Sequence, residues 1–154
     1  MHDLVISTFA PSDQHDAKTL MLCGLEEHWG ALDPALNPDL NDIAASYEHG
    51  VFVVARLKRL GGLVDGALVG TGALVPEGGN IGRIVRMSVD KAHRRKGIAS
   101  RILNTLVDHA HQRGYHTLVL ETTETWDDAI GFYQRHGFRI THHADGDAHF
   151  VWEL

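Results

Sequence analysis

The sequence predicts one α/β domain of the α+β type, in which a central, mixed and mostly antiparallel sheet of about seven strands is flanked by four helices. Two observations support this prediction. The 154 residues are enough to enclose one hydrophobic core, so residues 1–154 are expected to form a single domain. Strand-like and helix-like patterns also alternate, in the order strand, two helices, three strands, helix, strand, helix and two strands.

The first strand and two helices are expected before residue 51. Residues 5–9 alternate between apolar and polar, as in a half-buried strand, and residues 11–13 (Pro-Ser-Asp) are typical of a turn and a helix cap. Leucines recur at helical spacing up to Trp29, and Gly30 can end that helix. A second, short helix is predicted over residues 38–50.

The middle of the chain predicts a meander followed by a crossover. Three runs rich in valine and leucine, separated by glycine clusters, lie at 51–57, 66–75 and 83–89. From Ile98 the apolar residues follow a helical period, which Arg113-Gly114 can end. The strand-like run 117–121 follows this helix, so we expect it to pair in parallel with the strand that ends at Val89.

The end of the chain adds a helix and a hairpin. Thr125 and Asp128 have the spacing of a capping box, and Gly137 can end the helix that they begin. Two last strands are predicted at 138–141 and 149–154, with a turn over 145–147 between them.

Composition excludes several classes of protein. A net charge of −6 argues against a partner nucleic acid held by bulk phosphate neutralisation, and Cys23 is the single cysteine, so no intrachain disulfide or cysteine-based zinc site is expected. The twelve histidines show no metal-binding spacing such as HExxH, and the sequence does not define their role. No apolar stretch approaches a membrane span and no export signal is evident, so we expect a cytoplasmic protein with no membrane partner.

A basic, glycine-containing turn between a strand and a helix is the first candidate site. Unpaired amides and the helix dipole at a helix start favour an anion, and Gly97 and Ala99 leave room for a diphosphate to approach the backbone. Local positive charge comes from Lys91, Arg94, Arg95, Lys96 and Arg101. The alternative is a solvated basic patch with no ligand.

Two motifs resemble the Gcn5-related N-acetyltransferase (GNAT) family. Residues 94–99, Arg-Arg-Lys-Gly-Ile-Ala, match the family's pyrophosphate loop [QR]-x-x-G-x-[GA], and residues 129–138 match its A-I-x-x-Y-x-x-x-G-F segment. The sequence contains neither a GxxxxGK[ST] nor a GxGxxG pattern. The resemblance implies the acyl-CoA N-acyltransferase fold, with two parallel central strands that splay apart.

The resemblance implies acetyl-CoA as co-substrate and no metal. Its pantetheine arm would pair with the strand backbone, its pyrophosphate would lie on the loop amides, and Trp126, which stands where many members have asparagine, would pack against the arm or cap the core. The cofactor-binding residues implied in this way are Met87, Ser88, Val89, Arg94, Arg95, Lys96, Gly97, Ile98, Ala99, Ser100 and Trp126.

Two residues are candidates for catalysis. Tyr133 matches the family tyrosine that can protonate the departing thiolate, a small uphill transfer for a phenol of pKa about 10; alternatively it only packs. Some members have a glutamate base at the position of Arg83, which cannot take a proton. Glu121 is therefore the candidate base, and a strand-end carboxylate satisfied by neighbouring backbone is the alternative.

The function implied is transfer of acetyl from acetyl-CoA to a primary amine of a small acceptor, by direct attack in a ternary complex. A non-catalytic acyl-CoA sensor and a protein or peptide N-acetyltransferase are the alternatives, and homodimers would be unsurprising. Cys23 is expected to be a small core residue and not a covalent nucleophile. The acceptor itself is not identified by the sequence.

One charge asymmetry bears on the acceptor. Residues 19–55, which the resemblance places over the acceptor, carry carboxylates and no lysine or arginine before Arg56: Glu26, Glu27, Asp33, Asp39, Asp42 and Glu48. Such a field would concentrate cations, unless the carboxylates only cap helices and solubilise the surface. We therefore expect an acceptor with no strongly anionic remainder. Because Arg83 replaces the usual glutamate, an amine of lower pKa is easier to deprotonate, so we expect a small molecule with an α-amino-like or similarly acidic amine.

Overall fold

The computed structural model describes residues 3–30, 36–58 and 66–154. Within them, one seven-stranded sheet has the order β1-β2-β3-β4-β5-β7-β6. Its strands are β1 (Asp3–Thr8), β2 (Val51–Lys58), β3 (Leu68–Gly78), β4 (Ile81–Val89), β5 (Thr117–Thr123), β6 (Arg139–Ala144) and β7 (Asp147–Glu153). Only β4 and β5 pair in parallel, and the predicted fold class is confirmed.

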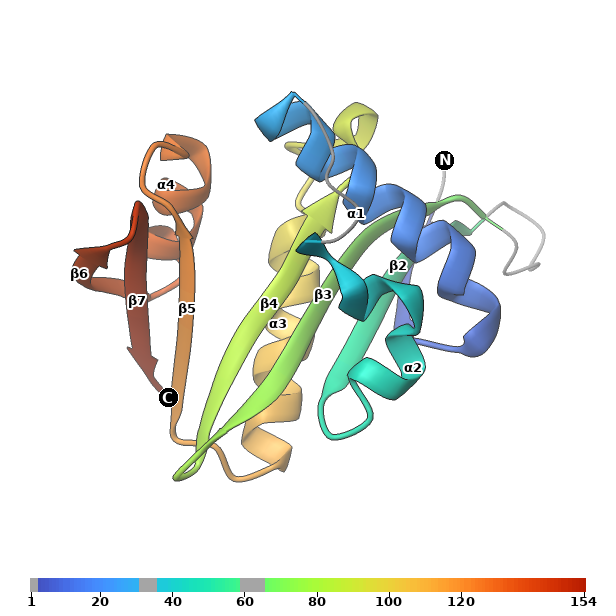
Figure 1. Ribbon diagram of the computed structural model, residues 1–154. Helices are drawn as coiled ribbons and strands as arrows, with labels where there is room; N and C mark the ends of the chain where they lie inside the picture. The colour runs from blue at the N-terminus through green and yellow to red at the C-terminus, as the bar shows by residue number, and fades with distance from the viewer. Residues whose placement is uncertain (1–2, 31–35, 59–65) are drawn as a thin grey trace.

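Four α-helices and three short 3-10 turns accompany the sheet in the described residues. The helices are α1 (Gln14–Trp29), α2 (Ile43–Ser46), α3 (Ile98–Gln112) and α4 (Asp127–Arg135), and the turns are η1 (Pro11–Asp13), η3 (Pro38–Asn41) and η4 (Lys91–His93). Figure 1 shows α1 and α2 on one face of strands β2 to β4 and α3 on the other. Within the described residues no helix has the length and apolar character that a membrane crossing requires.

Two hydrophobic cores lie on the two faces of the sheet. Val53 and Leu74 pack with α3 and with residues of α4 in the larger core, while Phe52 and Val54 pack with α1 and α2 in the smaller one. Alternate residues of β2 thus enter different cores. This is why residues 51–57 read as a nearly continuous apolar run.

The predicted helix over 38–50 is divided in two. Asp42 has an extended backbone (φ −147°, ψ 85°) that separates η3 from α2, and its carboxylate accepts a hydrogen bond from the Ala45 amide at 3.2 Å. A capping residue inside the predicted element therefore starts a new helix and shortens the first.

Two predicted caps differ in the structure. The prediction of a capping box formed by Thr125 and Asp128 was wrong, because α4 begins at Asp127 with Trp126 at its N-cap and has no side-chain cap hydrogen bond. Asp13 stands at the N-cap of α1, but its carboxylate does not bond the helix amides. It accepts instead from the Ala10 amide and from Arg56.

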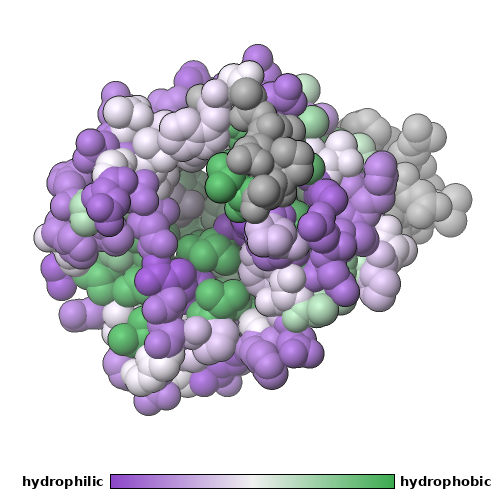
Figure 2. All heavy atoms as spheres, viewed as in Figure 1, coloured by the Kyte–Doolittle hydropathy of each residue, from purple (hydrophilic) through white to green (hydrophobic). Residues whose placement is uncertain are grey.

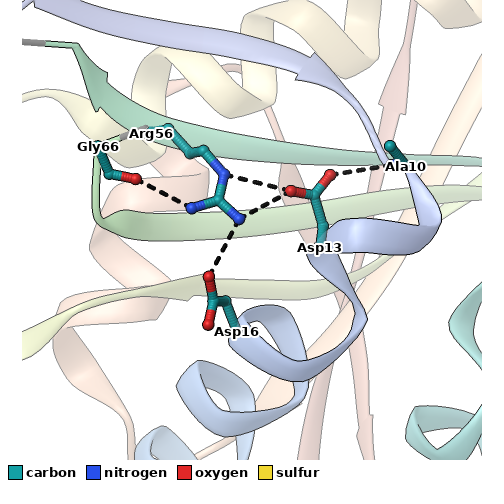
Figure 3. A network of polar contacts seen from close by, with 5 residues as sticks. All are labelled: Ala10, Asp13, Asp16, Arg56 and Gly66. Carbon is teal, nitrogen blue, oxygen red and sulfur yellow. Dashed lines mark hydrogen bonds and ion pairs between the residues drawn. The ribbon is translucent and has the colours of Figure 1, made fainter. Parts of the chain in front are cut away.

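A partly buried arginine network anchors the start of α1 (Figure 3). Nε and Nη2 of Arg56 donate to Asp13 Oδ1 at 3.2 and 2.8 Å, and Nη2 also donates to Asp16 Oδ2 at 3.1 Å. Nη1 donates to the Gly66 carbonyl at 2.9 Å. The network ties α1 to β2 at the end of the helix opposite Trp29.

The parallel strands β4 and β5 stay together only at their start. Their paired residues are Ile81 with Thr117, Gly82 with Leu118 and Arg83 with Val119. Beyond Arg83, β4 continues beside β3 and β5 continues beside β7, so the two strands diverge (Figure 1). We call this divergence the fork.

A β-bulge lies on the β4 side of the fork. Thr71 pairs with Ser88 and Ala73 with Val85, so β4 contains one more residue than β3 over this stretch. Arg86 in the bulge has a left-handed backbone (φ 57°), and the hydroxyl of the fully buried Thr71 donates to the Arg86 carbonyl at 2.9 Å. This hydrogen bond satisfies a carbonyl that the bulge removes from the ladder.

We predict that Thr71→Val lowers the free energy of unfolding by about 1–3 kcal/mol, because valine keeps the volume but removes the donor from the bulge carbonyl. Thr71→Ser retains the hydroxyl and loses one methyl group, so it should lose less, about 0.8 kcal/mol. Urea unfolding of the three proteins measures the difference. A valine variant as stable as the wild type would show that the bulge does not depend on this bond.

Candidate functional site

Charged side chains meet at the base of the fork. Nη1 of Arg83 donates to Glu121 Oε2 across the two strands, and Nε donates to Glu77 on β3. The hydrogen bond that Arg83 donates to Glu77 is the main reason that the pKa of Arg83 lies above its ordinary value, and the charge of Glu121 adds to it. The ion pair of Arg83 with Glu121 therefore closes the narrow end of the fork.

Glu121 lies at the fork, but it is not isolated. Arg83 occupies one carboxylate oxygen, Oε2, and the cross-strand neighbour of Glu121 on β7 is His149. The ring of His149 stacks on that of His142 of β6, with centroids 4.4 Å apart. No hydrogen bond or ion pair of Glu121 Oε1 is found among the described residues, and the role of Glu121 as a base stays a prediction.

The turn before α3 has an open backbone. Arg95 and Gly97 adopt left-handed conformations (φ 62° and 80°), and Gly97 is the N-cap of α3 without a side-chain hydrogen bond. Apart from Gly97 and its two chain neighbours, no heavy atom of the described residues lies within 4 Å of the position that a Cβ on Gly97 would occupy. The backbone at Gly97 is therefore open to a ligand, and the first amides of a helix have no intrahelical partner, as an anion site requires.

The basic residues of this turn differ in their surroundings. Arg95 is largely exposed, and its closest carboxylate is Asp128 at 3.9 Å. Arg94 in contrast forms an ion pair with Glu27 of α1 at 2.9 Å and donates to the Val89 carbonyl at 3.1 Å. Of these two arginines, Arg94 links α1 to the end of β4, while Arg95 keeps its charge in solvent.

Ser100, in the first turn of α3, connects the loop to α4. Its hydroxyl lies 3.0 Å from Nε2 of His136, whose ring contacts Phe132 with centroids 4.6 Å apart. Burial, with a contribution from the charge of Arg135, lowers the pKa of His136 below its ordinary value. Sequence reasoning missed His136, although it occupies an unspecified position of the second motif.

Tyr133 lies inside the larger core. Its ring packs against Phe132, Phe138 and Phe150 at centroid distances of 5.1 to 5.9 Å. Burial raises the pKa of the Tyr133 hydroxyl well above its ordinary value. The phenol therefore keeps its proton at neutral pH.

Two tryptophans meet above the fork. The rings of Trp29, at the end of α1, and Trp126, at the start of α4, are tilted at 48° with centroids 5.9 Å apart. Trp29 is 61% exposed. Figure 2 shows this face hollowed in its middle, with apolar residues in the hollow. Trp126, predicted to lie against a pantetheine arm, thus also forms an aromatic contact with α1.

The acidic stretch over 19–55 is partly neutralised. Glu27 pairs with Arg94, Asp39 pairs with Arg86 at 2.7 Å, and Asp42 caps α2. Asp33 lies outside the described residues. The negative field expected from the charge count is correspondingly weaker.

Two further expectations concern single residues and metals. Cys23 is exposed on α1, so the prediction that it is a core residue was wrong. Its place on the helix turns the thiol away from both hydrophobic cores. Among the residues that the structure describes, histidine, cysteine and carboxylate side chains form no group of three or more that could hold a metal ion.

Comparison with known proteins gives a consistent family. The family model described as "Acetyltransferase (GNAT) family" matches residues 16–138. Probable N-acetyltransferase family 8 member 5 of Mus musculus is 37% identical over 109 residues, which are 69% of this chain and 47% of that protein. N-acetyltransferase 8B of Homo sapiens is 35% identical over 118 residues, 71% of this chain and 49% of that protein. The chain spans about half the length of the curated relatives it matches.

Solved structures show the same fold at lower identity. An acetyltransferase of the GNAT family from Staphylococcus aureus Mu50 superposes with a TM-score of 0.86 at 21% identity, over 99% of both chains. The PaiA N-acetyltransferase from Thermoplasma acidophilum, solved in complex with coenzyme A, gives a TM-score of 0.80 at 15% identity, also over 99% of both.

Proposed function

This chain belongs to the GNAT family of acetyltransferases, and we propose that it transfers the acetyl group of acetyl-CoA to a primary amine of a small acceptor. The observation that carries the proposal is the fork between β4 and β5, which opens beside the unsatisfied helix start of α3. An anion site and an unpaired strand edge in one place fit a ligand that has a diphosphate followed by an arm with amide groups.

The donor would lie along β4. The diphosphate would accept hydrogen bonds from the amides of residues 95–100, with Lys96 and Arg95 as solvent-exposed charges. The pantetheine amides would pair with the backbone of residues 87–89, because β4 has no strand partner on its fork side there. The side chains of Met87 and Val89 pack into the larger core, which leaves their backbone for the ligand.

The reaction needs two proton transfers. The amine nitrogen attacks the thioester carbonyl, a carbon–nitrogen bond forms and the carbon–sulfur bond breaks. Glu121 Oε1 would take the proton that the amine loses, directly or through a water, and the Tyr133 hydroxyl would give its proton to the thiolate. A direct attack in a ternary complex needs no covalent intermediate on Cys23.

The proton cost favours an acceptor of lower basicity. An amine of pKa about 10.4 costs roughly 4 to 5 kcal/mol to deprotonate at neutral pH, whereas an α-amino group near 8 costs about 1 to 1.5 kcal/mol. Because two carboxylates over 19–55, Asp39 and Glu27, pair with arginines, this cost is a stronger argument than the charge count. We therefore propose an α-amino-like acceptor.

Thiol release from acetyl-CoA over a panel of amino acids, amino-acid amides, peptides, polyamines and aminoglycosides tests the function. We expect acceptor-dependent release, with the highest kcat/KM for a compound that has an α-amino group. A protein that binds acetyl-CoA in calorimetry but releases no thiol with any amine would be an acyl-CoA sensor and would contradict the proposal.

Gly97→Val should weaken CoA binding at least about tenfold, or about 1.4 kcal/mol, because the branched side chain would occupy the space of the diphosphate. The matched control is Gly114→Val at the other end of α3. Gly114 has a similar φ of 77° and equally open space at its Cβ position, so both variants carry the same kind of backbone strain. Equal CoA affinities of the two folded variants, measured by calorimetry, would refute the loop assignment.

Tyr133→Phe should lower kcat more than it raises the KM for acetyl-CoA, because general-acid assistance typically contributes about 10²- to 10⁴-fold. Stability should change little, since phenylalanine keeps the ring contacts with Phe132, Phe138 and Phe150. Tyr115→Phe, in a partly buried tyrosine that packs on the same core, is the control. If kcat stays within about twofold while chemistry is rate-limiting, Tyr133 only packs.

A further inference from the structure

Arg86 has an unusual backbone and a heavily used side chain. It is a non-glycine residue in the left-handed region (φ 57°), at the bulge of β4 on the fork side. Residues other than glycine occupy this region only where the surrounding structure holds them there. The hydroxyl of Thr71 donates to the Arg86 carbonyl from within the sheet, and the Arg86 guanidinium donates to the carboxylate of Asp39.

All three guanidinium nitrogens of Arg86 have partners on the segment that follows α1. Nε and Nη2 donate to the two oxygens of Asp39 at 3.0 and 2.7 Å, and Nη1 donates to Asn37 Oδ1 at 3.2 Å. The Tyr47 hydroxyl donates to Asp39 Oδ2 at 2.6 Å. We call these four residues the Arg86 clamp.

At neutral pH Arg86 and Asp39 are both charged, while the Tyr47 hydroxyl keeps its proton. Burial raises the pKa of Asp39, but hydrogen bonds from Arg86 and Tyr47 outweigh it, and the net pKa lies below the ordinary value. Burial and then the hydrogen bond to Asp39 raise the pKa of Tyr47 to about 12. Such a bidentate, half-buried pair is directional as well as attractive.

The clamp joins two parts of the site. One part is the segment 36–47, which we call acceptor-side because it lies within the residues 19–55 that the family resemblance places over the acceptor. Gln14 of α1 also holds this segment, since its Nε2 donates to the Leu40 carbonyl at 2.8 Å and its Oε1 accepts from the Ile43 amide at 3.0 Å. The other, donor-side part is the bulge, which continues directly into residues 87–89, the proposed seat of the pantetheine arm. Each nitrogen of the guanidinium thus donates to a partner within the clamp.

We propose that Arg86 is a positioning residue of acyl transfer, which through Asp39 fixes the acceptor-side segment 36–47 at a set distance from the donor-side bulge of β4. This inference rests on the proposed function. Holding two reactants in attack geometry supplies much of the rate of a bimolecular reaction, so a loosened clamp should reduce acceptor use without removing CoA binding.

The Arg56 network of Figure 3 is a matched control inside the same protein. Arg56 is also a strand arginine bound to a carboxylate near α1, and its side chain is 19% exposed against 22% for Arg86. It lies at the start of α1, away from the fork. Both networks contribute to stability, and only the Arg86 clamp touches the proposed site.

The experiment compares Arg86→Lys and Asp39→Asn with Arg56→Lys and Asp13→Asn. For each variant kcat/KM of the best acceptor, the Kd of CoA and the melting temperature are measured, with kinetics well below every melting temperature. We expect Arg86→Lys and Asp39→Asn to lower kcat/KM for the acceptor at least about tenfold with the Kd of CoA within about threefold. The Arg56 and Asp13 variants should stay within about twofold in kcat/KM.

Two further measurements separate positioning from simple destabilisation. The double variant R86K/D39N should be no worse in kcat/KM than either single variant, because both break the same contact. Hydrogen exchange should speed up over residues 36–47 in Arg86→Lys and near the start of α1 in Arg56→Lys. Should the lysine variant fail to fold, Arg86→Gly removes the clamp while suiting the left-handed backbone.

The outcomes are distinguishable. Equal losses of kcat/KM in the Arg86 and Arg56 variants, or additive effects in the double variant, would overturn the positioning role while the proposed function stands. A wild-type protein that releases no thiol with any amine would overturn the proposed function, and the role of Arg86 in transfer with it.

Discussion

The short parallel pairing of β4 and β5 is the constraint on which the rest of the site depends. The two strands can separate after Arg83 because each keeps its other neighbour, β3 for β4 and β7 for β5, so neither loses its place in the sheet. As a result, backbone groups that face the fork beyond Arg83 have no strand partner among the described residues. A bulge held by Thr71 fixes the β4 side, and the proposed donor would satisfy the exposed edge.

Three arginines on the sheet organise the charges of an acidic protein. Arg56 anchors the start of α1, Arg83 spans the base of the fork to Glu121, and Arg86 binds the segment after α1. Each pairs with at least one carboxylate that lies far away in the sequence. Counting charges along residues 19–55 overstates the negative field there, because Asp39 pairs with Arg86 and Glu27 pairs with Arg94.

Much of the architecture and one half of the site could be predicted. The pyrophosphate-loop motif at 94–99 and the segment at 129–138 identified the family, and the strand and helix periods gave nearly every element. Boundaries that depend on one cap were less secure: Asp42 divides a predicted helix, and Thr125 does not cap α4. A short polar side chain can form a hydrogen bond with any of several nearby backbone groups, and the amino-acid sequence alone does not identify the group that it binds.

The sequence by itself determined most of the elements, their order and the residues proposed to bind an anion, because periodicity and glycine-containing turns are local properties of the chain. Only the tertiary structure decided how far β4 and β5 stay paired, that Arg83 meets Glu121, and that Arg86 meets Asp39 across 47 positions of sequence. His136 beside Ser100 likewise depends on how α4 packs against α3. Such contacts form between elements distant along the chain, so their partners are selected by packing and by the geometry of the bulged strand and not by any local pattern.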